Sequence, residues 1–166
     1  MVNENAHIEK IKSILDQIND PEIPVISITD LGIVRDIQMQ NDQVIISITP
    51  TYSGCPAMDM ITTQIRMEML AAGYKQVEIR QILSPAWTTD WMTEQGKTKL
   101  VEYGIAAPLP TKSVCTPTRF AAEEAIQCPH CKSYNTKRIS EFGSTACKAL
   151  YHCESCLEPF DYFKCH

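Results

Sequence analysis

The chain has 166 residues, 44% of them hydrophobic and 21% charged, and a net charge of −5. This length allows one hydrophobic core and a small second module. The acidic balance argues against a nucleic-acid ligand, and no apolar run reaches the ~20 residues of a membrane span. The N-terminal segment lacks the order of a secretory signal, so we expect a cytoplasmic protein without nucleic-acid or membrane partners.

A helix is expected first. Residues 4–19 place three isoleucines and a leucine on one side of a helix. Asp20-Pro21 is expected to end this helix, because the residue before a proline is pushed out of helical geometry.

Two strands follow in the prediction. Ile33–Gln40 and Gln43–Thr49 are β-like runs joined by the hairpin-competent turn Asn41-Asp42. Alternate residues of the second run share one face of the strand, which we expect to be buried: Val44, Ile46 and Ile48.

The next elements are a helix, a strand and a helix. Residues 56–72 carry apolar side chains at helical spacing, and Gly73 is placed to end that helix. Val77–Leu83 alternates as a strand does, and Thr89–Tyr103 is expected to be helical, although Gly96 weakens its middle. The order α-β-β-α-β-α predicts an α+β fold, in which helices cover a small mixed sheet.

Cysteine usage divides the chain. Six of the eight cysteines lie in residues 126–166, a segment with a net charge of +1, whereas residues 1–125 carry −6. We therefore expect an α/β domain over residues 1–105, a proline-containing connector over 106–125 with an idle thiol at Cys115, and a metal-stabilised module over 126–166.

The tail contains two Cys-x-x-Cys pairs, CPHC and CESC, separated by twenty-one residues. This spacing approximates a zinc ribbon, in which two tight turns deliver four thiolates to one tetrahedral zinc ion: Cys128, Cys131, Cys153 and Cys156. An iron–sulfur cluster on the same four thiolates, two disulfides and redox-active pairs are the alternatives.

Four further tail residues could contact a metal. Cys147 and Cys165 are less favoured ligands, which we expect to be buried or idle thiols. His130 and His152 adjoin the two pairs, but four cysteines already complete a tetrahedral site.

Cys55 stands apart, in the stretch TPTYSGCPAMDM where a strand gives way to a helix. The start of a helix favours a thiolate, so we expect a lowered pKa for this thiol. Gly54 allows close approach of a partner, and Pro56 suits a first helical turn. Packing of the thiol at the strand–helix junction is the alternative.

Asp20 and Glu22 lie in the loop after the first helix, where solvated loop acids are the alternative to a role near Cys55. The sequence contains no glycine-rich phosphate loop, no G-x-S-x-G elbow and no H-E-x-x-H helix. An ordinary hydrolase, kinase or dehydrogenase is therefore not expected.

Four motifs in order, DPEIP, ITDLGIVRDI, SITPTYSGCP and SPAWTTDWM, resemble the MIP18-like iron–sulfur cluster assembly family, once catalogued as a domain of unknown function. The appended cysteine ribbon is similar to that of the D-subunit family of bacterial phenylacetyl-CoA epoxidase systems. The resemblance implies that Cys55 is a functional thiol, with Asp20, Glu22, Thr49 and Thr51 as its neighbours. Pro50, between the two threonines, departs from the family pattern and implies that the strand ends there or lies at an edge.

The resemblance also implies a function. It suggests a non-catalytic accessory factor that assists iron–sulfur or metal-centre assembly in a di-iron monooxygenase of phenylacetate degradation. Its partners would be oxygenase or reductase subunits, with a homodimer left open, and its cofactors a structural zinc and transiently held iron or an iron–sulfur cluster. Two alternatives are an iron–sulfur electron-transfer or catalytic subunit of the oxygenase, and a pure scaffold.

Overall fold

The computed structural model describes residues 4–109 and 125–164, which form two compact units that divide between Trp87 and Thr88. Each unit is described separately below. The predicted connector, with Cys115, lies largely outside the described residues, and so does Cys165. The domain boundaries expected from composition stay a prediction.

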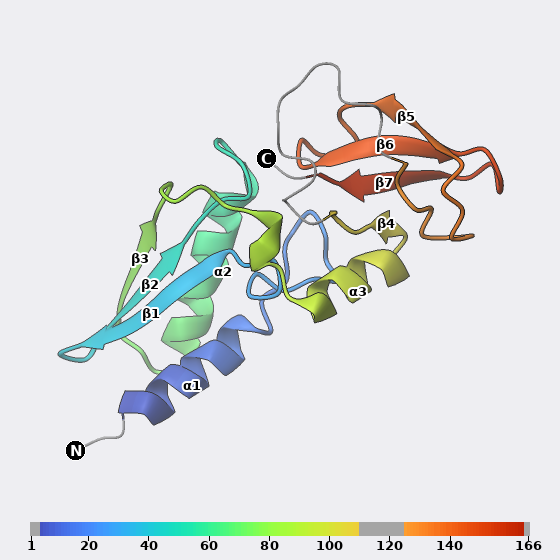
Figure 1. The fold of residues 1–166 in the computed structure, drawn as a ribbon. Helices are drawn as coiled ribbons and strands as arrows, with labels where there is room; N and C mark the ends of the chain where they lie inside the picture. The colour runs from blue at the N-terminus through green and yellow to red at the C-terminus, as the bar shows by residue number, and fades with distance from the viewer. Residues whose placement is uncertain (1–3, 110–124, 165–166) are drawn as a thin grey trace. The chain divides into compact units, whose positions relative to one another are not determined.

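The first unit contains a three-stranded sheet with two helices. Its elements are α1 (Glu4–Leu15), β1 (Val34–Gln40), β2 (Gln43–Ile48), α2 (Ala57–Ala71) and β3 (Gln76–Gln81). The strand order is β1-β2-β3, with β1 antiparallel and β3 parallel to the central β2. Helix α2 connects the two parallel strands and lies against the sheet (Figure 1). The predicted α+β fold with a small mixed sheet is confirmed.

The core of this unit centres on β2. Val44, Ile46 and Ile48 are fully buried, as the alternation predicted, and Ile45 on the opposite face is buried as well. Both faces of the central strand are therefore covered. Buried apolar residues of α2 supply one part of the surrounding core: Ala57, Met58, Ile61, Ile65 and Met69.

Helix α1 ends earlier than the sequence predicted. It stops at Leu15 rather than at residue 19, and Gln17 and Ile18 continue in tighter turns. The carbonyl of Ile18 accepts a hydrogen bond of 2.9 Å from the N–H of Ile28 instead of a helical one. The loop that follows is part of the core, because most of its aliphatic residues are buried: Ile18, Ile23, Ile26, Ile28, Leu31 and Ile33.

The predicted turn between β1 and β2 is confirmed. Asn41 and Asp42 have φ values of 48° and 67°, the left-handed conformation that both central residues of a tight hairpin turn adopt and that Asn and Asp tolerate.

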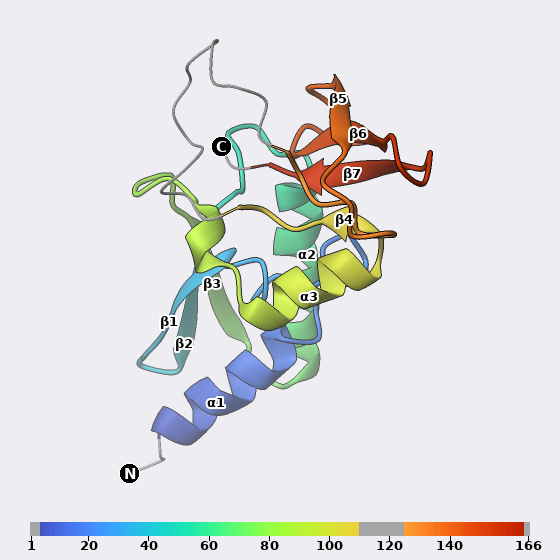
Figure 2. The same cartoon turned by 45° about the vertical axis from the view of Figure 1, so that its right-hand side comes forward.

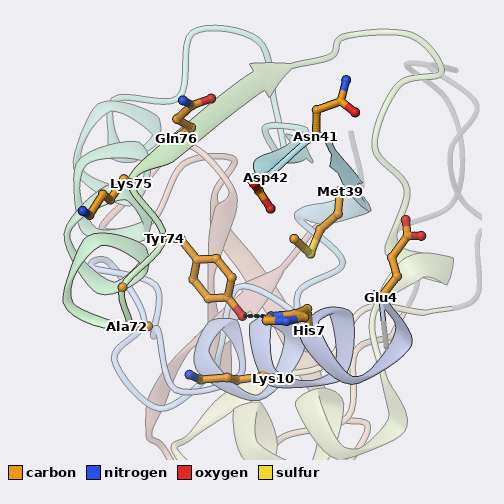
Figure 3. A pocket seen from close by; sticks show the side chains of 11 residues that line it. Glu4, His7, Lys10, Met39, Asn41, Asp42, Ala72, Tyr74, Lys75 and Gln76 are labelled. Carbon is orange, nitrogen blue, oxygen red and sulfur yellow. Dashed lines mark hydrogen bonds between the residues drawn. The ribbon is translucent and has the colours of Figure 1, made fainter. Parts of the chain in front are cut away.

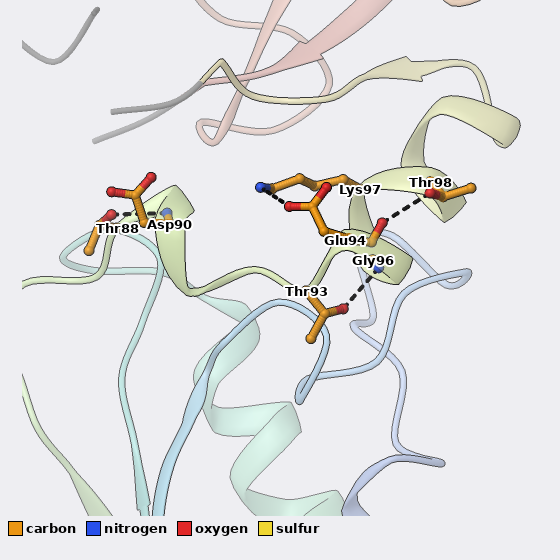
Figure 4. A network of polar contacts seen from close by, with 7 residues as sticks. All are labelled: Thr88, Asp90, Thr93, Glu94, Gly96, Lys97 and Thr98. Carbon is orange, nitrogen blue, oxygen red and sulfur yellow. Dashed lines mark hydrogen bonds and ion pairs between the residues drawn. The ribbon is translucent and has the colours of Figure 1, made fainter. Parts of the chain in front are cut away.

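The second unit begins with a short 3-10 helix η1 (Thr89–Trp91), helix α3 (Glu94–Glu102) and strand β4 (Ile105–Ala106). The single helix expected over Thr89–Tyr103 is thus divided in two. Thr88 caps η1 by accepting a hydrogen bond from Asp90 N–H, and Thr93 caps α3 by accepting one of 2.9 Å from Gly96 N–H (Figure 4). The second cap explains the break, because a residue with an extended backbone cannot continue a helix.

Three strands complete this unit: β5 (Thr136–Ser140), β6 (Lys148–Cys153) and β7 (Pro159–Phe163). The sheet has the order β4-β7-β6-β5, and β4 alone is parallel to its neighbour (Figure 2). Its core is a small cluster of buried residues that includes two cysteines: Ala106, Ile126, Cys128, Ala149, Tyr151, Cys153, Phe160 and Tyr162. Among the described residues, no helix is long and apolar enough to cross a membrane.

A buried ion pair joins β6 to β7. The Lys148 ammonium lies 3.6 Å from a carboxylate oxygen of Asp161, and the two side chains are 6% and 23% exposed. The same carboxylate oxygen accepts a hydrogen bond of 3.2 Å from Ser144. Lys148 is therefore the more buried partner and depends on the carboxylate for compensation.

This difference in burial predicts an asymmetry. Asp161→Asn should destabilise the second unit by about 3 kcal/mol, because it leaves a buried ammonium unpaired, whereas Lys148→Met should cost under about 1 kcal/mol. Lys137→Met, at an exposed position of β5, is the matched control and should change stability by less than about 0.5 kcal/mol. Hydrogen exchange of the β6 amides measures all three, and equal costs for Asp161→Asn and Lys148→Met would contradict the account.

Candidate functional site

Cys55 lies in the loop between β2 and α2, at the carboxyl end of the central strand. Its N–H donates to the Tyr52 carbonyl at 3.3 Å, and its carbonyl accepts from Met58 N–H at 3.3 Å. Pro56 occupies the N-cap of α2 and provides no side-chain cap. Gly54 has a φ of 82°, which glycine adopts without strain, and a Cβ built there would meet no atom within 4 Å. The thiol is thus partly buried at an open turn.

Asp20 is held in place by its own loop. One carboxylate oxygen accepts hydrogen bonds from the N–H groups of Glu22 at 2.8 Å and Ile23 at 2.9 Å. The Asp20 residue is 7% exposed. A carboxylate is rarely buried to this degree unless hydrogen-bond partners compensate its charge. The loop after α1 therefore fixes one acidic side chain, with Glu22 beside it.

The Cys55 thiol interacts electrostatically with both acids. Burial raises the pKa of the thiol, and the negative charges of Glu22 and Asp20 raise it further, against hydrogen bonds from Ala57 N–H and the Tyr52 side chain. The expected lowering of the Cys55 pKa is therefore wrong, because desolvation and two carboxylates outweigh the start of α2. Asp20 and Glu22, which the family resemblance implies as neighbours of Cys55, lie near enough to raise its pKa.

Thr49 and Thr51 are buried at the end of β2, with exposures of 1% and 8%. Thr49 N–H donates to the Ile33 carbonyl at 2.9 Å, but its hydroxyl has no hydrogen-bond partner among the described residues. A buried hydroxyl without a partner costs about 1–3 kcal/mol, so such groups call for a bound ion, water or ligand. Tyr52 is the neighbour of Cys55 that the motif pattern missed. Its place in the same short loop was the available signal.

The four tail cysteines form a second, separate cluster. The sulfur atoms of Cys128, Cys131, Cys153 and Cys156 all lie within 4.8 Å of one another. The distance is 3.8 Å from Cys128 to Cys156 and 3.5 Å from Cys131 to Cys153. A tetrahedral ion with metal–sulfur bonds of about 2.3 Å places its sulfurs about 3.8 Å apart, whereas a disulfide would place them about 2.0 Å apart. The described side chains are thus arranged as a four-thiolate metal site.

Each pair of cysteines belongs to a turn of the same geometry. The carbonyl of the first cysteine accepts from the N–H four residues on, at Lys132 (3.0 Å) and Leu157 (2.9 Å). These two residues share the left-handed backbone, with φ values of 64° and 63°. A hydrogen bond of 2.8 Å between the Ser133 and Ser155 hydroxyls links the two turns.

Backbone N–H groups favour a thiolate at one position of the cluster. The N–H groups of Cys156 and Ser155, with the Cys131 thiol, lower the pKa of Cys153 to about 6 against the effect of burial. The pKa of Cys156 is raised to about 12, because burial and the neighbouring thiols outweigh the N–H of Glu158. Backbone N–H donors therefore favour the thiolate at Cys153 over the thiolate at Cys156.

Among the described residues, the other candidate tail ligands do not join the cluster. Cys147 is buried, and its sulfur lies 3.0 Å from the Thr145 hydroxyl. His130 and His152 are not among the grouped ligands of the described residues, as the sequence predicted.

A hollow of about 690 Å³ lies at the hairpin end of the sheet in the first unit, away from Cys55. Figure 3 shows Tyr74 and His7 meeting at its floor, where the Tyr74 hydroxyl lies 3.2 Å from His7 Nδ1. The Lys10 ammonium lies 5.8 Å from the centre of the Tyr74 ring. Charges of both signs border this hollow, and it contains neither cysteines nor the acids of the Asp20 loop.

The sequence and the fold are those of an iron–sulfur cluster assembly domain joined to a zinc beta ribbon domain. A family model described as an iron–sulfur cluster assembly protein matches residues 8–80, and one described as the PaaD zinc beta ribbon domain matches residues 112–164. The chain belongs to the iron–sulfur cluster assembly family, in the branch that carries this ribbon.

A particular relative matches nearly the whole chain. The Escherichia coli (strain K12) protein named as the putative D subunit of 1,2-phenylacetyl-CoA epoxidase is 49% identical over 95% of this chain and 93% of its own length. A Porphyromonas gingivalis (strain ATCC BAA-308 / W83) protein named Fe-S protein maturation auxiliary factor is 35% identical over 55% of this chain and 89% of its own. A solved domain of unknown function from Bacillus anthracis, 25% identical, covers 58% of this chain and 93% of its own with a TM-score of 0.54.

The electrostatics of the Cys55 loop predict slow alkylation of Cys55 near neutral pH in metal-free protein, because the raised pKa keeps the thiol protonated. Glu22→Gln removes one negative charge and should shift the rise of the alkylation rate to lower pH. Glu68→Gln, on the exposed face near the far end of α2, should leave it unchanged. The pH–rate profile of iodoacetamide labelling at Cys55 measures the effect, and identical profiles for the two variants would refute it.

The four-cysteine cluster predicts that Cys153→Ala lowers the metal content from about one ion per chain to nearly none. Because Cys128 and Cys153 belong to the core of the second unit, the variant should also lose hydrogen-exchange protection in β6 and β7, while β2 in the first unit keeps its own. Cys147→Ala removes a buried thiol outside the cluster and should retain the metal. Element-resolved metal analysis measures the content, and an undiminished value for Cys153→Ala would disprove the site.

Proposed function

We propose that this protein is an accessory maturation factor of a multicomponent phenylacetyl-CoA epoxidase, a di-iron monooxygenase of phenylacetate degradation. It assists iron–sulfur cluster or metal-centre assembly in a partner subunit and does not itself turn over substrate. The observation that carries this proposal is the placement of the Cys55 thiol within the electrostatic influence of Glu22 and Asp20, in a unit separate from the four-cysteine cluster. The names of the relatives support the same function.

The donor set of the Cys55 loop suits a transient cargo. The Cys55 sulfur has the carboxylates of Glu22 and Asp20 within electrostatic reach, and the buried Thr49 hydroxyl at the end of β2 lacks a partner among the described residues. A resident iron–sulfur cluster ordinarily takes four thiolates, and this loop has one. A ferrous ion accepts mixed sulfur and oxygen donors, so we propose that Cys55 holds iron, or one corner of a nascent cluster, until thiolates of the client complete the site.

The cation would also change the loop's electrostatics. A positive charge among the thiol, Asp20 and Glu22 compensates the two carboxylates and ionises the thiol. Without a metal, the same surroundings raise the pKa of the thiol. Desolvation of Asp20 and its fixed position keep these groups close without an ion present. We infer that the loop is assembled in advance for a cation.

The ribbon has a different role in this proposal. Sulfur–sulfur distances of 3.5 and 3.8 Å suit one tetrahedral ion, whereas an iron–sulfur cluster places several atoms between its cysteine ligands and so separates them further. We therefore propose a structural zinc, with the ribbon serving to dock an oxygenase or reductase subunit. The same distances disfavour the alternative in which the tail holds an iron–sulfur cluster for electron transfer. Paired free thiols of this kind persist in a reducing compartment, which supports a cytoplasmic location.

Cys55→Ala is expected to abolish activation of the epoxidase while the ribbon metal and hydrogen-exchange protection stay at native levels, because the thiol is a ligand for cargo and not part of the core. Activity of the epoxidase subunits co-produced with each variant, together with their iron content, measures activation. Ser53→Ala, at an exposed position of the same loop, is the matched control and should activate fully. Full activation with Cys55→Ala would sink the proposal.

A further inference from the structure

We propose that Cys131 is a modification site, at which a small oxidant such as hydrogen peroxide attacks the ribbon metal centre first, and that a disulfide to Cys153 then releases the metal. The inference rests on metal binding by the four-cysteine cluster and is independent of the role of Cys55. The two cysteine turns share the same backbone hydrogen-bond pattern, but they differ in exposure and in charge.

Exposure separates the four ligands. Cys128 and Cys153, the first cysteines of the two turns, are fully buried within the core of the unit. Of the second cysteines, Cys156 is partly buried and packs against that core, whereas Cys131 is exposed. Oxidation of a thiolate follows its accessibility, so solvent species meet Cys131 before the other three.

Charge separates the two turns further. Lys132 follows Cys131 directly, and its ammonium folds back on the same turn by donating to the Pro129 carbonyl at 2.7 Å. The corresponding position after Cys156 is the neutral Leu157, and Glu154 and Glu158 border that turn. When a thiolate attacks a peroxide, negative charge moves onto the departing oxygen. A nearby ammonium stabilises that charge and carboxylates oppose it.

The short distance between two sulfur atoms favours the second step, which is disulfide formation. Cys131 and Cys153 have sulfur atoms 3.5 Å apart, whereas those of Cys128 and Cys156 are 3.8 Å apart. A disulfide needs about 2.0 Å, so the two sulfurs must approach by about 1.5 Å once the metal no longer holds them. The disulfide would link the two turns across the emptied site.

The chemistry balances as follows. The Cys131 thiolate attacks one oxygen of the peroxide, the O–O bond breaks, a hydroxide ion leaves, and a sulfenic acid forms on sulfur. The Cys153 thiolate then attacks the Cys131 sulfur, the S–O bond breaks, and a second hydroxide leaves as the disulfide forms. The two sulfurs together lose two electrons, which reduce one peroxide to two hydroxides. The metal, left with two thiolates, dissociates.

The test uses the full-length metal-loaded protein treated with limiting hydrogen peroxide. Metal release is followed with a metallochromic dye, and modified cysteines are located by mass spectrometry after trapping sulfenic acid with dimedone. We expect the first adduct within the cluster at Cys131, and a Cys131–Cys153 disulfide that appears at the rate of metal release. A first adduct at Cys156, or metal release that precedes any change at Cys131, would overturn the proposal.

Two matched variants test whether Cys131 is the cysteine that the oxidant attacks first. Cys131→His and Cys156→His each retain a nitrogen ligand that zinc accepts in place of sulfur. Cys131→His should release metal roughly tenfold more slowly under peroxide, because it lacks the accessible thiolate, whereas Cys156→His should release it at about the native rate. Equal protection by both variants would refute the inference. If a histidine variant fails to hold metal, the mapping on the native protein decides alone.

Discussion

The second unit depends on one constraint, which is that four sulfur atoms must share a volume less than 5 Å across. Cys128 and Cys153 are at once metal ligands and members of the unit's small core. Without a cation, ionised thiols at this distance would repel one another, and protonated thiols would leave the turns without a link. The cysteine-rich module of residues 126–166 has about 40 residues, too few to obtain enough stability from apolar burial alone. The two left-handed turns and the strand end at Cys153 therefore surround a site that needs an ion.

The first unit obtains its stability from apolar burial instead. Its central strand is buried on both faces, and the long loop after α1 adds six aliphatic side chains to the core. That loop also carries Asp20, whose carboxylate is fixed by two backbone N–H groups. A rigid loop on a well-packed sheet can hold charged groups near Cys55, because the stability of the core offsets the free-energy cost of desolvating them. The four-cysteine cluster and the Cys55 thiol thus lie in different units of the chain.

Much of this architecture could be predicted from periodicity. The alternation of β2, the helical spacing of α2 and the turn at Asn41-Asp42 are local signals, and they gave the correct elements. The early end of α1 was not predictable, because it depends on the distant partner Ile28, which takes the carbonyl of Ile18. The division of the last helix follows from the cap at Thr93, a local signal that the apolar pattern concealed.

The two candidate sites also differ in how much of them could be predicted from the sequence. The spacing of Cys128, Cys131, Cys153 and Cys156 was enough to predict their convergence, because each pair comes from one tight turn. The pKa of Cys55 was predicted with the wrong sign, because the helix start is visible in sequence whereas burial and the approach of Glu22 arise only from tertiary folding. Strand β4 pairs with β7 across more than fifty residues of chain, and no local pattern in two residues could have indicated it.

If Cys55 carries a cation as proposed above, its raised pKa has a consequence for the direction of metal transfer. A thiol that rests in its protonated form must release a proton when it binds a cation, and it must regain one when the cation departs. Loading and delivery are then an exchange of one cation for one proton at the same sulfur. Proton availability in the surroundings of the client would set how readily the cargo leaves, and re-protonation behind the departing ion would oppose its return.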